Sequence, residues 1–128
     1  MTKQSKTERR QYPRVKKSLP LKIAADGFDF ITSTQNISCL GTYCRLDKYI
    51  PPFTKITVKL TLPMMADNSE RRNCLVECKG VVVRTEDEEK GGFNVAIFFN
   101  EIKDPQKEKI SQYLSQFMPK EYPSPKRL

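Results

Sequence analysis

The chain has 128 residues, 38% of them hydrophobic and 30% charged, and 23 lysines and arginines against 15 acidic residues give a formal net charge of +8. This length and composition suit one soluble globular domain and are not those of a disordered chain. The sequence contains no histidine, which excludes serine–histidine and cysteine–histidine catalytic pairs, so we predict that the protein is not an enzyme.

The positive charge favours a polyanionic partner, such as nucleic acid, an anionic membrane or a phosphorylated small ligand. No apolar run typical of a signal peptide follows Met1, and no stretch approaches the roughly 20 apolar residues of a membrane span. The cysteines are spaced C-x4-C and C-x3-C, unlike a zinc knuckle, so we predict no metal site and no cofactor. We expect a cytoplasmic protein with reduced, mostly buried thiols.

Residues 1–18 are polar and strongly basic. Pro13 pushes Tyr12 towards extended geometry and disfavours a helix. We therefore predict an extended N-terminal arm or loop at residues 1–18.

Residues 19–118 are predicted to form one domain of short antiparallel strands with a closing helix. Alternation of apolar and polar side chains indicates strands at residues 19–24, 28–34, 43–46, 55–62, 74–83 and 93–99. Turn-forming or polar residues separate them at residues 26–27, 36–41, 63–73 and 86–92. Short strands at this spacing predict a mainly β fold, a closed or nearly closed barrel of about six strands.

A helix is predicted to follow the last strand. Asp104 is its expected N-cap, and Pro105 suits its first position. Helical spacing places an apolar stripe on one face, which we expect to pack against the barrel: Ile110, Tyr113, Leu114, Phe117 and Met118. Pro119 ends the helix, and residues 119–128 are predicted to be a disordered tail.

Two short patterns contain the candidate binding residues. The first is R-x3-R in the N-terminal arm, preceded by a further arginine, and the second is N-x-S-x2-G at a junction between strands. Together they contain Arg9, Arg10, Arg14, Asn36, Ser38 and Gly41. Taken singly, the first pattern equally describes a solvated basic arm, and the second equally describes a turn.

In this order, ahead of this strand pattern, the two motifs resemble the PilZ domain family over roughly residues 8–118. The resemblance extends to Val82-Val83-Arg84 and to residues 92–99, which look like the last two barrel strands of the family. It implies a six-stranded antiparallel PilZ-type β-barrel with a C-terminal α-helix. It also implies a cyclic di-GMP receptor whose ligand is held by the N-terminal loop and the barrel face.

The resemblance maps Arg10 and Arg14 onto the two motif arginines, whose guanidinium groups suit phosphates and guanine edges. Asn36 can hydrogen-bond a guanine, and Ser38 can donate to a phosphate or hold the loop. Gly41 permits a turn or a close backbone approach. These three residues form the polar half of the expected site.

Arg9 adds a further guanidinium and suggests an intercalated pair of ligands. Ligand binding is expected to order the arm against the barrel and so to create a surface for a downstream protein partner. Two alternatives stay open: a PilZ-like adaptor that binds only protein, and a basic barrel that binds nucleic acid, which the outward Tyr43 and Arg45 support. No basic and aromatic stacking platform is evident, so we predict that nucleic acid is not the partner.

Overall fold

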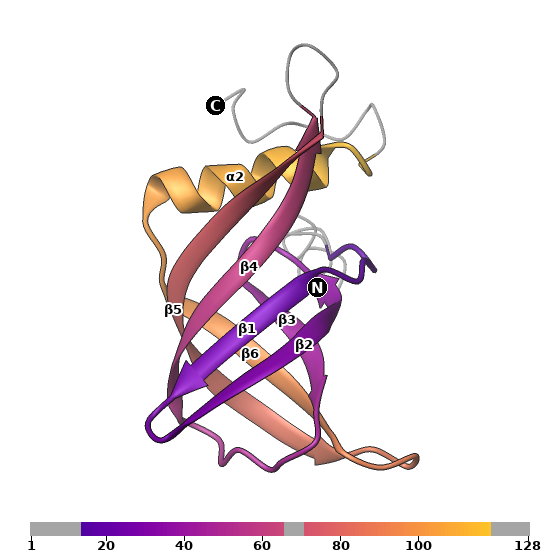
Figure 1. Cartoon of the computed structure of the whole chain (residues 1–128), viewed down its shortest axis with the longest axis vertical. Helices are drawn as coiled ribbons and strands as arrows, with labels where there is room; N and C mark the ends of the chain where they lie inside the picture. Colours follow the sequence, from indigo (N-terminus) through magenta and orange to yellow (C-terminus); the bar gives the residue numbers. More distant parts are fainter. Residues whose placement is uncertain (1–13, 66–70, 119–128) are drawn as a thin grey trace, which may run out of the picture.

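The structure is a computed structural model that describes residues 14–65 and 71–118. Its elements are β1 (Pro20–Ala25), β2 (Phe28–Ile37), β3 (Gly41–Leu46), β4 (Lys55–Met65), β5 (Arg71–Asp87), β6 (Phe93–Glu101) and α2 (Asp104–Ser115). The strands pair in the order β1-β2-β3-β6-β5-β4, every pair is antiparallel, and pairing of β4 with β1 closes the barrel (Figure 1). The predicted six-stranded antiparallel barrel with a C-terminal helix is confirmed.

The barrel interior follows from the alternation of side chains along each strand. In β4, Ile56, Val58, Leu60 and Leu62 are 0–4% exposed, whereas Lys59 between them faces solvent. The inward side chains of β1, β3 and β6 meet these residues in one continuous core. Full burial of such an aliphatic side chain stabilises a fold by about 1.5–3 kcal/mol, so this alternation determines which face of each strand points inward.

The helix α2 covers one end of the barrel, beside β5 and far from the β1–β2 turn and the β5–β6 hairpin (Figure 1). Three of the five residues in the predicted apolar stripe are buried in the core: Ile110, Tyr113 and Leu114. The side-chain oxygen of Gln106 also accepts a hydrogen bond from the backbone N–H of Glu77 at 3.0 Å. Because β6 does not pair with this part of β5, α2 replaces a missing strand neighbour there. No helix in the described ranges is long and apolar enough to cross a membrane.

The predicted limits of the helix are wrong at both ends. Lys103 is the N-cap, with extended backbone angles, and Asp104 already lies within the helix. The helix ends at Ser115, so Phe117 and Met118 follow it in a turn, and Phe117 is 39% exposed. Helical periodicity cannot distinguish a last helical turn from a following turn with similar spacing, because both place residues three and four apart on one side.

The predicted limits of the polar loop at residues 63–73 are also wrong, and residues 66–70 lie outside the described residues. β4 continues to Met65 and β5 begins at Arg71, with Pro63 opposite Asn73 and Met65 opposite Arg71. In Figure 1 this hairpin rises above the part of the barrel that the other strands enclose. Pro63 and residues 71–73 are exposed, and Met64 is only partly buried. These residues therefore lack the strong apolar alternation that the sequence analysis used as its signal.

The four cysteines are free thiols, with Cys39, Cys44 and Cys78 buried and Cys74 half-buried, as the sequence predicted for most of them. Burial raises the pKa of Cys44 from 9.0 to about 12. Burial, with a smaller contribution from the Glu77 carboxylate, also raises the pKa of Cys78 to about 12. Within the described ranges, no cluster of acidic and cysteine side chains could hold a metal ion.

Because the Cys44 and Cys78 thiols have raised pKa values, we predict that the protein loses stability in alkali. Their pKa values are higher in the folded protein than in the unfolded chain, so the folded state retains the proton between pH 9 and 12. The free energy of unfolding should then fall by up to about 1.4 kcal/mol per pH unit for each thiol as the pH rises above 9. Urea unfolding at pH 7 and pH 10 measures this loss. It should be smaller in Cys44→Ala, and an equal loss in the variant would contradict the prediction.

Candidate ligand-binding site

The described end of the predicted N-terminal arm is attached to the barrel. The backbone N–H of Val15 donates to the carbonyl of Ile37 at 2.9 Å, and the N–H of Ile37 donates back at 3.0 Å. This antiparallel bridge fixes Arg14 beside the end of β2, with its side chain exposed to solvent. Arg9, Arg10 and most of the arm lie outside the described residues, as does the predicted tail at residues 119–128.

Thr34 connects the segment that follows Arg14 to β2. Its side chain is 2% exposed, and its hydroxyl accepts a hydrogen bond from the backbone N–H of Leu19 at 2.9 Å and donates to the carbonyl of Lys17. One buried hydroxyl therefore satisfies two backbone groups of a segment that has few other hydrogen bonds to the barrel.

We predict that Thr34→Val lowers the free energy of unfolding by about 1–2 kcal/mol, because valine has the same shape but leaves both backbone groups of the segment unpaired. Thr34→Ser keeps the hydroxyl and should retain most of the stability. Urea unfolding of both variants beside the wild type measures the difference. A serine variant as unstable as the valine variant would show that the lost methyl group, and not the hydrogen bonds, is responsible.

Asn36 lies within β2, which runs to Ile37, so the connection to β3 is shorter than predicted. A register shift between Thr34 and Asn36 places Asn36 directly opposite Tyr43 of β3. The side-chain oxygen of Asn36 is buried and has no hydrogen-bond partner among the described residues. Because buried polar atoms are nearly always paired, this oxygen is an acceptor whose donor is absent from the part of the chain that the structure describes.

Ser38 and Gly41 shape the turn between β2 and β3. Ser38 is 2% exposed, and its hydroxyl accepts a hydrogen bond from the N–H of Leu40 at 3.1 Å. The backbone N–H of Ser38 donates to the carbonyl of Gly41 at 2.9 Å. A Cβ atom at Gly41 would overlap the carbonyl oxygen of Ile97 in β6. In this geometry both residues hold the turn in place, and Gly41 permits the close backbone approach that the sequence predicted.

Tyr43 and Arg84 adjoin these motif residues. The guanidinium carbon of Arg14 lies 5.9 Å from the centre of the Tyr43 ring, and that of Arg84 lies 5.5 Å from it. Arg84 Nη2 also donates a hydrogen bond to the Tyr43 hydroxyl. The barrel register places Asn36, Tyr43, Ala96 and Arg84 in one row across β2, β3, β6 and β5.

The motif analysis did not identify Tyr43 and Arg84 as site residues. Tyr43 gave a weak signal, because it faces outward in a strand that follows the N-x-S-x2-G pattern. Arg84 was named only as part of a strand that resembles the family, and its place in the site depends on a register shift between Val82 and Arg84 in the pairing of β5 with β6. Of the six predicted site residues, the four that the structure describes lie at this end of the β2–β3 hairpin.

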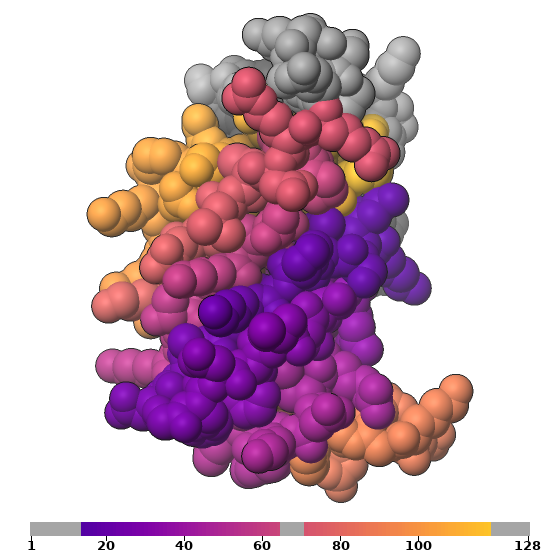
Figure 2. Space-filling view, in the orientation of Figure 1, coloured from indigo at the N-terminus to yellow at the C-terminus, as the bar shows by residue number. Residues whose placement is uncertain are grey.

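The β5–β6 hairpin lies at the opposite end of β3 from the β2–β3 turn and projects from the body of the barrel (Figure 2). Arg45 Nε donates to the carbonyl of Gly91 at 3.0 Å, which ties the hairpin to β3. The amide of Asn94 donates to Glu88 at 2.9 Å, and this hydrogen bond is the main cause of a lowered Glu88 pKa. The side-chain oxygen of Asn94 is itself buried without a partner in the described part of the chain.

A closed six-stranded antiparallel barrel, covered at one end by a helix and flanked by an arginine-bearing N-terminal segment, defines a class of small domains. Residues 8–116 match the PilZ domain family. The chain therefore belongs to the PilZ domain family. The comparison with curated proteins finds no significant match.

Two solved structures have the same fold. The inhibitor of motility (MotI/DgrA) of Bacillus subtilis superimposes with a TM-score of 0.71 at 19% sequence identity, covering 84% of this chain and 50% of that protein. This chain thus spans half the length of that relative. The PilZ domain of YcgR from Escherichia coli, solved with c-di-GMP, superimposes with a TM-score of 0.56 at 12% identity, covering 84% of this chain and 90% of that one. At sequence identities this low, the structural similarity establishes the shared fold alone.

Proposed function

We propose that this protein is a cytoplasmic receptor for cyclic di-GMP that signals to a downstream protein and catalyses no reaction itself. The observation that carries the proposal is the position of Arg14 beside the ring of Tyr43. Tyr43 is the strand neighbour of Asn36, whose side-chain oxygen has no partner among the described residues. Membership of the PilZ family and the c-di-GMP bound to the YcgR domain support it.

The chemistry of the ligand suits these groups. Cyclic di-GMP presents two anionic phosphates and two guanines, and an arginine fork can bond either a phosphate or the O6 and N7 edge of guanine. The buried oxygen of Asn36 can accept a hydrogen bond from a guanine N–H. One cation and one neutral acceptor on neighbouring positions thus match the two chemical parts of one nucleotide.

We extend the proposal to Arg9 and Arg10, which precede Arg14 in the same motif. Binding of a dianionic ligand would bring these guanidinium groups to the barrel face near the β2–β3 hairpin, so the arm and the ligand together would form a new surface. In this proposal that surface is what the downstream protein recognises.

Calorimetric titration of the full chain with cyclic di-GMP tests the proposal, with cyclic di-AMP as the control ligand. We expect saturable binding of cyclic di-GMP and much weaker binding of cyclic di-AMP, which lacks the guanine edge. Two ligands per chain would support the intercalated pair suggested by Arg9, and one would exclude it. No binding to a correctly folded protein would overturn the proposal and favour the protein adaptor, and strong binding of RNA or DNA that weakens steeply with salt would favour the nucleic-acid alternative.

A further inference from the structure

Arg84 belongs to neither sequence motif, yet it shares the Tyr43 ring with Arg14. We propose that Arg84 is a further ligand-binding residue, which contacts a phosphate of cyclic di-GMP from the barrel side, and that Tyr43 is the residue that positions it. This inference rests on the proposed function and adds the strand β5 to the binding site.

The placement of Arg84 follows from the barrel register. β3, β6 and β5 are neighbours, with Tyr43 opposite Ala96 and Ala96 opposite Arg84. Ala96 is 9% exposed although it lies on the outer side of the barrel, and its small side chain leaves room for its larger neighbours in this row. Arg84 can therefore reach across β6 to the Tyr43 hydroxyl and aromatic ring.

The charge distribution around this ring favours an anion. Two guanidinium groups lie within 6 Å of the ring centre, so an anion beside this ring would be attracted by both cations. Glu86 pairs with Arg84 at 3.5 Å, but both side chains are more than half exposed. An ion pair as exposed as this one is weak, so a phosphate can replace the carboxylate at little cost.

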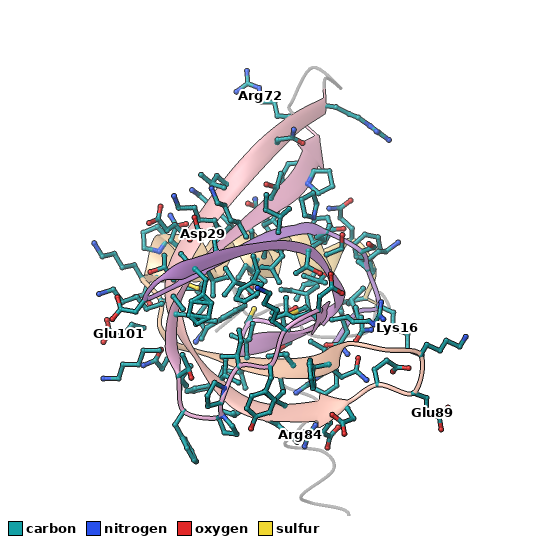
Figure 3. All side chains as sticks on the ribbon, turned by 60° about the horizontal axis from the view of Figure 1, so that its bottom comes forward. Lys16, Asp29, Arg72, Arg84, Glu89 and Glu101 are labelled. Carbon is teal, nitrogen blue, oxygen red and sulfur yellow. The ribbon has the colours of Figure 1, made fainter. Side chains whose placement is uncertain are left out.

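Tyr43 fixes the direction of the Arg84 side chain before any ligand arrives. The hydroxyl of Tyr43 accepts the Nη2 hydrogen bond, and its ring limits the rotation of the guanidinium group. In Figure 3 Arg84 points outward from the barrel wall, whereas Arg72 lies on the same strand at the far end of the molecule. A side chain held in its binding geometry loses less conformational freedom when it binds, which increases affinity.

The test compares cyclic di-GMP affinity between variants of the full chain by calorimetry. Arg84→Ala should weaken binding roughly 10- to 100-fold, the effect of losing a charge-assisted hydrogen bond. Arg72→Ala removes the same charge from the other end of β5 and should bind like the wild type. Arg84→Lys keeps the charge without the planar fork and should fall between the wild type and Arg84→Ala.

Two tyrosine variants separate positioning from folding. Tyr43→Phe removes only the hydroxyl and should weaken binding a few-fold, whereas Tyr43→Leu also removes the ring and should weaken it further. If Tyr43 acts through Arg84, Tyr43→Phe should have no additional effect in the Arg84→Ala background. Equal affinity of the wild type and Arg84→Ala would overturn this inference alone, while absence of binding by the wild type would overturn the proposed function itself.

Discussion

Gly41→Ala is expected to lower the free energy of unfolding by roughly 2–3 kcal/mol, the largest stability effect that we predict for one added methyl group. The new Cβ atom would overlap the carbonyl oxygen of Ile97, a backbone atom that cannot rotate away. Relief requires β3 and β6 to separate at the first residue of β3, where Gly41 faces Phe98. Urea unfolding of the variant beside the wild type measures the loss.

Gly27→Ala is the matched control, because it adds the same methyl group to another turn. Gly27 has a φ of +86° and no atom lies within 4 Å of the position that its Cβ would take, so the cost should be only that of left-handed backbone, about 1–2 kcal/mol. If Gly41→Ala proves no more destabilising than Gly27→Ala, the close approach of β3 to β6 does not limit this position. If it proves more destabilising, the glycine of the motif is required by the barrel itself.

Sequence periodicity predicted those parts of the fold in which one face of a strand is buried. The alternation of Ile56, Val58, Leu60 and Leu62 with polar residues identified β4, and these four residues are buried. The same signal fails at the far end of the β4–β5 hairpin, where Pro63 pairs with Asn73 outside the enclosed part of the barrel. The alternation of apolar and polar residues reflects the burial of one face of a strand, so a strand segment without a fully buried face does not show this alternation.

The candidate site could be predicted only where its residues are close in sequence. The pattern of Asn36, Ser38 and Gly41 lies within one hairpin, and its conformation follows from local hydrogen bonds. The position of Arg84 beside Tyr43 depends instead on the strand order of the barrel, in which β6 lies between β3 and β5, and on the register shift between Val82 and Arg84 in the pairing of β5 with β6. A register shift reverses the face of the sheet on which a side chain lies, and no residue type in this sequence indicates a shift at this position.

Arg14→Ala is expected to weaken cyclic di-GMP binding by about 100-fold or more, since a bidentate guanidinium contact to phosphate or guanine would be lost. The same variant should unfold at nearly the wild-type urea concentration. Arg14 is exposed, and its described contact is the Tyr43 ring at 5.9 Å, an interaction that contributes about 0.5–1 kcal/mol at such a site. Calorimetry and urea unfolding of the same preparation measure the two effects together.

Lys16→Ala is the control that separates a specific contact from general attraction. Lys16 is an exposed cation two residues from Arg14 in the same segment. Its removal changes the local charge by as much as removal of Arg14 does, but it leaves the contact between Arg14 and Tyr43 intact. We expect Lys16→Ala to weaken binding no more than a few-fold. Equal losses in the two variants would mean that the segment attracts the ligand only through its net charge, and the assignment of Arg14 as a contact residue would fail. A large loss confined to Arg14→Ala would instead identify a guanidinium held at one place on the barrel, which is what the Val15 bridge and the Tyr43 ring provide.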